Sequence, residues 1–142
     1  MPQTGIPTET ECVSEYTAMK LNKAKYAYLI FGMDKDYSKI QIIKKGEENA
    51  SYDEFVAELP LDDCRYAVVN IKFSLEDGGE REKLLFIQWS PNKAKLKSKM
   101  LYSTSKEDFK KQLNGVAIEL QANGPEEVTF DEALAKCMQF AK

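Results

Sequence analysis

The feature that most constrains the fold is a pair of apolar strands in the middle of the chain. Residues 65–75 alternate with the two-residue period of a strand, and apolar side chains occupy both faces: Ala67, Val69 and Ile71 on one, Tyr66 and Val68 on the other. The next residues, Glu-Asp-Gly-Gly-Glu at 76–80, favour a turn into a second apolar strand at 83–89. Two strands joined in this way are antiparallel neighbours, and these are too apolar to leave a whole face in water. The sequence therefore predicts a sheet covered by helices on both faces.

The flanking segments supply those helices and further strands. Three capping boxes, which begin at Thr8, Ser51 and Thr129, predict helix starts, and the first helix is expected to run to about Lys23. Strands are predicted at 26–33 and 40–43, as a hairpin, and at 116–121. The inner stripe of the last helix is predicted to be Phe130, Leu134, Cys137 and Met138. The whole chain, 1–142, is predicted to be one α/β domain with a flexible N-terminal arm at about residues 1–8 and a mixed sheet of about five strands.

The segment after the second apolar strand predicts a helix with two different faces. Ser90 is expected to cap it and Pro91 to occupy its first position. A core-facing stripe follows at 100° per residue: Ala94, Ser98, Leu101, Tyr102, Ser105, Phe109 and Leu113. Leu96 and Met100 point the other way and are ringed by lysines 95, 97 and 99, which is typical of a protein-docking helix. The alternative is that another segment buries Leu96 and Met100.

Composition argues against several functional classes. The 142-residue chain contains no histidine, so the commonest general base and zinc ligand are missing, and the three cysteines fit reduced core residues. The balance of 20 basic against 23 acidic residues disfavours a general nucleic-acid binder. No apolar run is long enough for a membrane span. The adjacent carboxylates Asp62-Asp63 and Glu126-Glu127 fit solvated turns. We therefore expect a cytoplasmic, monomeric binding protein with no catalytic residues, cofactor or metal.

Several blocks together resemble the actin-depolymerising factor/cofilin family. They are Thr4-Gly-Ile, Asp63-Cys-Arg-Tyr-Ala, Lys83 to Pro91, Lys97 to Lys106 and Leu113-Asn-Gly. The resemblance runs nearly end to end and implies the ADF-homology fold, a central mixed sheet sandwiched by helices. It also implies a cytoskeletal protein that binds ADP-actin monomers and filaments and promotes filament severing and depolymerisation.

Carried over by motif, the resemblance implies two surfaces. The monomer-binding surface would comprise Thr4, Gly5, Ile6, Leu96, Lys97, Lys99, Met100, Glu126 and Glu127. The filament-binding surface would comprise Arg81, Lys83 and Lys136, with neutral Ala135 and Gln139 where the family usually has charges. Thr4 takes the place of the family's phosphorylated serine, so it is a candidate regulatory phosphorylation site.

Two other functions remain open from the sequence. The neutral residues on the last helix favour a monomer-sequestering protein with weak filament attachment. Seven lysines between residues 93 and 111 favour an adaptor that binds phosphoinositides at a membrane surface.

Overall fold

One mixed sheet organises the protein. The computed structural model describes residues 6–116 and 118–139. Its strands are β1 (Tyr28–Met33), β2 (Ile40–Gly46), β3 (Arg65–Ser74), β4 (Glu80–Trp89) and β5 (Ile118–Ala122), in the spatial order β2-β1-β3-β4-β5. Neighbouring strands are antiparallel except for β4 and β5, which are parallel. The predicted central hairpin and the predicted mixed sheet are both confirmed.

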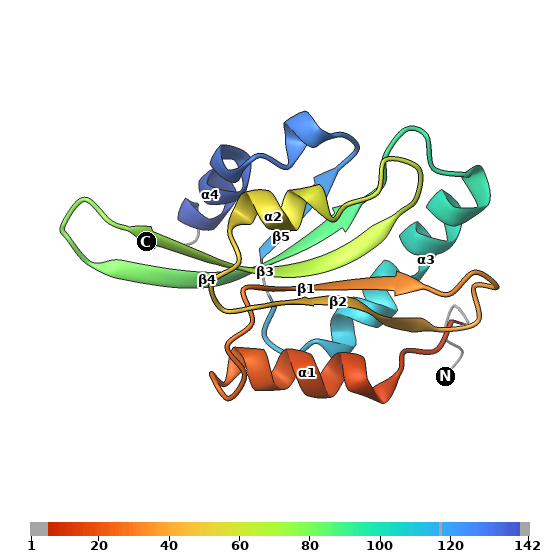
Figure 1. The fold of residues 1–142 in the computed structure, drawn as a ribbon, viewed down its shortest axis with the longest axis horizontal. Helices are drawn as coiled ribbons and strands as arrows, with labels where there is room; N and C mark the ends of the chain where they lie inside the picture. The colour runs from red at the N-terminus through yellow and green to blue at the C-terminus, as the bar shows by residue number, and fades with distance from the viewer. Residues whose placement is uncertain (1–5, 117, 140–142) are drawn as a thin grey trace.

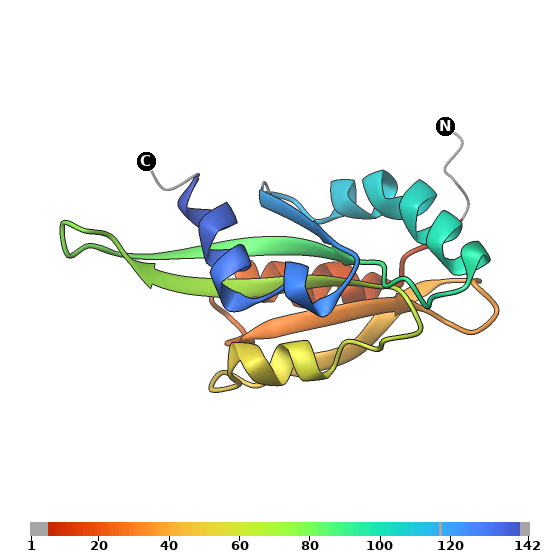
Figure 2. The same cartoon turned by 90° about the horizontal axis from the view of Figure 1, so that it is seen from above.

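Helices cover both faces of this sheet (Figures 1 and 2). They are α1 (Thr10–Lys20), α2 (Tyr52–Ala57), α3 (Leu96–Gln112) and α4 (Phe130–Met138), with a short 3₁₀ helix, η1 (Pro125–Glu127), before α4. Helices α1 and α3 pack on one face, and α2 and α4 on the other. Within the described ranges, no helix is long and apolar enough to cross a membrane.

The alternation of β3 divides the core into two clusters. Ala67, Val69 and Ile71 lie in the cluster under α2 and α4. Tyr66 and Val68 lie in the cluster under α1 and α3. Because both faces of the strand are buried, the two-residue period alone assigns each side chain to its layer, as predicted.

The far end of the β3–β4 hairpin projects from the body of the molecule (Figure 1). Its turn is closed by a hydrogen bond from the Leu75 N–H to the Gly79 carbonyl (2.7 Å), and Gly78 adopts a φ of 89°. This left-handed conformation is one that glycine tolerates without steric cost, which explains a glycine at position 78.

The predicted start of α3 is wrong. The helix begins at Leu96 with Lys95 as its N-cap residue, and no side chain caps it. Ser90 continues the sheet instead, because its N–H donates to the Ala122 carbonyl (2.9 Å). The N–H of Ala94 then donates to the Pro91 carbonyl (3.0 Å), so these residues form a separate turn before the helix.

The predicted cap of α1 is also wrong. The N-cap residue is Glu9, without a side-chain cap, whereas Thr8 forms an isolated bridge with Ile40 and its hydroxyl accepts from Gln112 (3.2 Å). Helix α1 ends at Lys20 rather than Lys23, since Asn22 adopts a φ of 60° that cannot continue a right-handed helix.

The other two predicted caps are confirmed, but part of the inner stripe of α4 is wrong. Side-chain oxygens of Ser51 and Thr129 accept from backbone N–H groups three residues later (3.1 and 3.3 Å). In α4 the buried residues are Ala133 and Cys137, while Phe130 and Met138 are each 40% exposed. They lie at the two ends of this short helix, beyond the stretch that covers the sheet.

Candidate functional site

The outer face of α3 carries an exposed apolar pair. Leu96 is 73% exposed and Met100 is 58% exposed, and the spacing of four residues stacks them one turn apart on the helix. No described segment covers them, so the alternative in which they are buried is wrong. Exposed apolar side chains that stand together on a helix are typical of a docking surface.

The inner face of α3 fixes the helix against the sheet. Ser98, Tyr102, Ser105 and Phe109 are buried, as the stripe predicted, whereas Leu101 is only partly buried. The Tyr102 hydroxyl accepts from the Met33 N–H (2.7 Å), and the Tyr66 hydroxyl donates to the Tyr102 carbonyl. Burial raises the pKa of Tyr102 to about 12, so its hydroxyl is neutral at physiological pH. These contacts orient the outer face of the helix rigidly.

Asp63 holds the first turn of α3. Its Oδ1 accepts from the Ser98 hydroxyl and from the Cys64 N–H (2.8 Å each), and its Oδ2 pairs with Arg65 Nη1 at 3.0 Å. Burial would raise the pKa of the Asp63 carboxyl, but the hydrogen bonds and the Arg65 charge outweigh it and lower that pKa below its usual range. The prediction that Asp62 and Asp63 are both solvated turn residues is wrong for Asp63, which is half-buried, whereas Asp62 is exposed. Asp63 belongs to the Asp63-Cys-Arg-Tyr-Ala block that carries part of the family resemblance. Its anchoring role could not be predicted from local pattern, because its partner Ser98 lies 35 residues away in the chain.

The two lysines nearest the apolar pair lean toward different segments. Lys97 Nζ lies 5.4 Å from the ring centroid of Tyr37, in the β1–β2 turn. Lys99 Nζ donates to the Asn92 carbonyl (2.9 Å), in the turn that precedes the helix. The two positive charges therefore flank the Leu96/Met100 pair on separate sides instead of reinforcing each other on one side.

The remaining predicted monomer-surface residues differ in their freedom to contact a partner. Ile6 is partly buried against the core under α1 and α3. The next residue, Pro7, is fixed to β2 by a hydrogen bond from the Ile40 N–H to its carbonyl (2.8 Å). Thr4 and Gly5 lie outside the described residues. Glu126 is exposed in η1, but Glu127 Oε1 accepts from the Asn123 N–H (2.7 Å) and holds the turn after β5.

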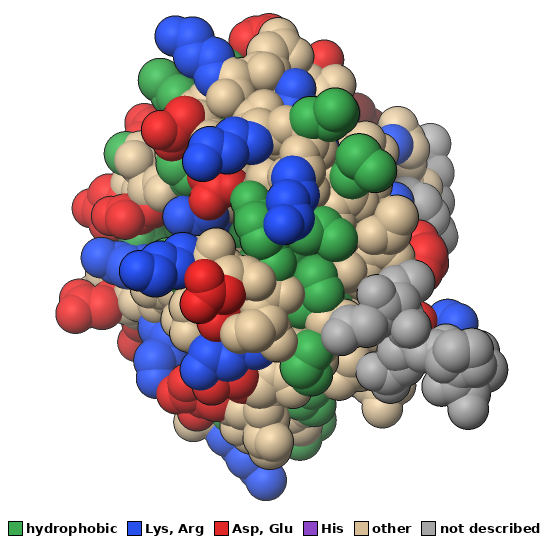
Figure 3. All heavy atoms as spheres, turned by 90° about the vertical axis from the view of Figure 1, so that its right-hand side faces the viewer, with side chains coloured by type: hydrophobic (Ala, Val, Ile, Leu, Met, Phe, Trp, Pro, Cys, Tyr) green, Lys and Arg blue, Asp and Glu red, His purple; other side chains and the backbone are tan. Residues whose placement is uncertain are grey.

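The end of the molecule where α3 begins faces the viewer in Figure 3. Hydrophobic side chains gather near the middle of this face, with Lys and Arg side chains among them. Acidic side chains lie mostly in the left half of the view, interspersed with Lys and Arg, and some of them border the hydrophobic middle. An apolar centre with cations beside it suits a partner that has an apolar cleft bordered by carboxylates.

The predicted filament residues lie at the other end of the molecule. Arg81 is exposed on β4, near the tip of the projecting hairpin, and Lys83 is partly buried on the same strand (Figure 1). Burial raises the pKa of the Cys137 thiol in α4 to about 11, and the positive charge of Lys83 partly offsets that shift. Lys83 therefore lies close to α4, the helix that carries Lys136. Ala135, on α4, and Gln139, its C-cap residue, are exposed and add no charge.

Comparisons with known proteins agree on one family. The model of the family described as cofilin/tropomyosin-type actin-binding protein matches residues 5–138. Actin-depolymerizing factor 8 of Arabidopsis thaliana is 38% identical over 127 residues, which covers 89% of this chain and 90% of the relative. Cofilin of Cryptococcus neoformans is 40% identical over 133 residues, with 93% and 95% covered. The crystal structure of Streptomyces griseoflavus cofilin superposes with a TM-score of 0.86 at 36% identity and covers 95% of this chain and 98% of its own.

Proposed function

The chain belongs to the cofilin/tropomyosin-type actin-binding family, and from this premise we propose that it is an actin-depolymerising factor. It binds actin monomers and filaments, prefers the ADP-bound form, and severs filaments at the cytoskeleton in the cytoplasm. It acts as a single domain of residues 1–142, as a monomer, by binding rather than by catalysis. The observation that carries this function is the exposed Leu96/Met100 pair on a helix whose opposite face is locked to the core.

In the proposed monomer complex, Leu96 and Met100 enter an apolar cleft on actin. Apolar anchors near the centre of an interface supply most of its binding energy, and charges around them set register and the rate of encounter. Lys97 and Lys99, on separate sides of the pair, take the second role. Thr4, Gly5, Ile6 and Glu126 extend the contact at its margins. Glu127 is better suited to holding its own turn, because its carboxylate is already used.

Filament binding uses a second surface formed by Arg81, Lys83 and Lys136. This surface lies at the opposite end of the molecule from the start of α3, so one molecule can contact two neighbouring subunits at once (Figure 1). A ligand changes a structure only through its different affinities for two states. Contacts to two subunits favour the filament geometry in which both are satisfied, and this is how binding would alter the filament twist and promote severing.

The test is high-speed co-sedimentation with ADP-actin filaments, in which both the pelleted protein and the actin left in the supernatant are measured. The wild type should pellet and should raise supernatant actin. Replacing Arg81 and Lys83 with Ala should reduce pelleting while monomer affinity is retained, since these residues lie away from α3. Lys111→Ala, at an exposed position in the last turn of α3 and away from its first turn, is the matched control. If the wild type neither pellets nor releases actin, the proposed function is wrong.

The monomer-sequestering alternative rests on Ala135 and Gln139, which leave Lys136 as the only cation of α4 within its described residues. It predicts that supernatant actin rises without pelleting in the same assay. Introducing arginine at both positions should then restore pelleting.

The proposed phosphoinositide adaptor is less well supported. Two lysines of α3, Lys106 and Lys110, are paired with Glu119 at 2.6 and 2.7 Å and are mostly buried, so they contribute little to a free basic surface. The remaining lysines could still hold phosphoinositides as a regulatory ligand, and liposome flotation at increasing salt tests this. Phosphate on Thr4 would place negative charge near a surface proposed to meet an acidic protein, so a phosphorylated chain should bind actin monomers more weakly.

A further inference from the structure

The sheet has an open edge along the outer half of β3. Strand β1 pairs with β3 only at residues 66–69, and the last bond on this side runs from the Asn70 N–H to the Ala27 carbonyl (3.0 Å). Beyond this point, β3 continues to Ser74 paired with β4 alone among the described strands. The N–H and C=O of one strand residue point to the same side. The peptide groups of Lys72 and Ser74 therefore point, like the Asn70 N–H, toward the side that β1 has left.

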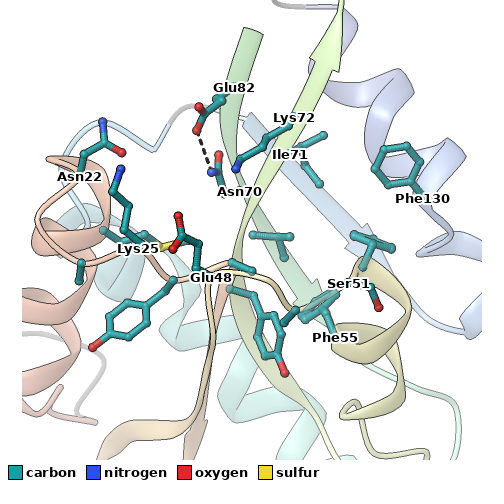
Figure 4. Close-up of a pocket in the computed structure, with 18 residues that line it drawn as sticks. Asn22, Lys25, Glu48, Ser51, Phe55, Asn70, Ile71, Lys72, Glu82 and Phe130 are labelled. Atoms are coloured by element: carbon teal, nitrogen blue, oxygen red, sulfur yellow. Dashed lines mark hydrogen bonds between the residues drawn. The ribbon is translucent and has the colours of Figure 1, made fainter. Parts of the chain in front are cut away.

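A hollow of about 260 Å³ lies along this open edge (Figure 4). It contacts four consecutive residues, 69–72, and since successive side chains of a strand point to opposite faces, a hollow that touches all four must run along the strand edge. In Figure 4, Asn70, Ile71 and Lys72 lie between Lys25 on one side and Phe130 on the other. Phe55 and Ile71, both almost fully buried, contribute an apolar floor.

A second hollow, of about 430 Å³, adjoins the first on the α1 face of the hairpin. The two share Met19, Asn22, Asn70, Lys72 and Glu82. The second is lined mainly by polar and charged side chains, among them Lys20, Lys72 and Arg81. The open edge therefore has, on the α2/α4 face, a hollow with an apolar floor and a polar border, and on the α1 face a charged hollow.

Cations and acids both line this edge: Lys20, Lys25, Lys72 and Arg81 on one side of the balance, and Glu48, Glu80 and Glu82 on the other. Of the neighbouring acids, Glu82 already accepts from the Asn70 side chain (2.9 Å). Lys20 donates to the Asn114 carbonyl (2.9 Å) and Arg81 to the Glu80 carbonyl (3.0 Å), whereas Lys72 forms no ion pair within the described ranges. A carboxylate placed opposite Lys72 on an added strand would therefore meet a free cation.

We propose that the β3 edge at residues 70–74 binds an extended segment of a partner protein in which apolar and acidic residues alternate. The segment adds a strand to the sheet: its backbone pairs with the peptide groups of Lys72 and Ser74, its apolar side chains enter the hollow over Phe55 and Ile71, and on the opposite face its carboxylates meet Lys72. A second copy of this chain fits poorly. In an antiparallel pairing centred on the edge, Lys72 would lie opposite Lys72 of the other copy, and like charges directly opposed destabilise a sheet.

The test uses a short capped synthetic peptide in which valine and aspartate alternate, titrated into ¹⁵N-labelled full-length protein. We expect saturable shifts of the Lys72 and Ser74 amide signals and a Kd of about 1 mM or tighter. The same peptide N-methylated at the amides of one edge should bind at least about tenfold more weakly, because it cannot form the ladder. A peptide with lysine in place of aspartate should also bind at least about tenfold more weakly.

Two protein variants separate the contribution of backbone hydrogen bonding to peptide binding from the contribution of charge. Lys72→Pro removes an N–H that points away from β4, so the hairpin can keep its ladder while peptide binding is lost. Lys72→Glu should reverse the preference between the aspartate and lysine peptides, whereas the control Lys35→Glu, in the exposed β1–β2 turn, should change neither. If Lys72→Pro fails to fold, the N-methylated peptide gives the same information with the wild-type protein.

No binding of the aspartate peptide, equal binding of the N-methylated peptide, or shifts confined to other segments would each overturn the proposal. The titration contains no actin, so its failure is distinguishable from failure of the proposed actin function. Arg81 belongs both to the charged hollow and to the proposed filament surface. A bound peptide should therefore also reduce co-sedimentation with filaments.

Discussion

Truncation of the exposed pair on α3 should separate binding from stability. Burying a Leu or Met side chain completely contributes about 2.5 kcal/mol relative to leaving it in water. Leu96 is 73% exposed and Met100 is 58% exposed in the free protein. Burial of these exposed parts by a partner would therefore contribute about 2 kcal/mol of binding free energy for Leu96 and about 1.5 kcal/mol for Met100. Alanine keeps the first carbon of each side chain, so Leu96→Ala with Met100→Ala should cost about 3 kcal/mol of binding. That loss is on the order of a hundredfold in Kd for ADP-actin monomers, measured by fluorescence titration.

The same double variant should leave the fold nearly intact. Only the minor, buried parts of the two side chains are lost from the folded protein, and alanine has the higher helix propensity. The free energy of unfolding should change by no more than about 1 kcal/mol, measured by urea denaturation. The matched control is Leu21→Ala, which removes a 54% exposed leucine just after α1, at the opposite end of the molecule, and should change neither quantity.

Two outcomes would refute this reasoning. If monomer affinity is unchanged while the control behaves as expected, the outer face of α3 is not the docking surface. If the double variant loses several kcal/mol of stability, these residues are buried in solution and α3 is a core helix.

Three further variants test the contacts that hold the site. Tyr102→Phe removes the acceptor of the buried Met33 N–H and should lower the free energy of unfolding by about 1–3 kcal/mol, measured by urea denaturation. Asp63→Asn should lose about 1–2 kcal/mol and increase hydrogen exchange in the first turn of α3, where Ser98 loses its charged acceptor; no change in exchange there would contradict the anchoring role. The pKa of Glu119 is lowered because the hydrogen bonds and charges of its two lysine partners outweigh the effect of burial. The contribution of the Glu119 carboxylate to the free energy of unfolding should be complete above the unfolded pKa of about 4.3, and it should be lost as pH falls through the lower folded pKa. Glu119→Gln should therefore flatten that part of the curve of unfolding free energy against pH.

Local sequence was sufficient where one short-range rule decides the outcome. The period of β3 places Ala67 and Val68 in opposite core layers, and the caps at Ser51 and Thr129 form as predicted, because each depends only on residues within one or two turns. The 3.6-residue period of α3 also distinguishes its buried stripe from the exposed Leu96 and Met100 without reference to the segments that pack on the helix.

Rules of the same kind failed where a distant segment competed for the residue. Ser90 is a good cap residue, but the Ala122 carbonyl, 32 positions later in the chain, holds its N–H at the end of the sheet, and its hydroxyl accepts from the Cys64 thiol (3.6 Å). The helix starts only after a further turn. Thr8 is likewise used by a bridge to Ile40 instead of capping α1. Long-range pairing in a sheet outweighs a single capping bond, which contributes only about 1 kcal/mol.

The sequence by itself determined the layers of the sheet, the two-faced character of α3 and the absence of histidine chemistry, because these follow from composition and from periods of two and 3.6 residues. Only the tertiary structure decided that Leu96 and Met100 stay exposed, that Asp63 anchors Ser98, and that β3 extends beyond the end of β1 and leaves an open edge. Each of these depends on where segments far apart in the chain end relative to one another in space, and no local pattern encodes that distance.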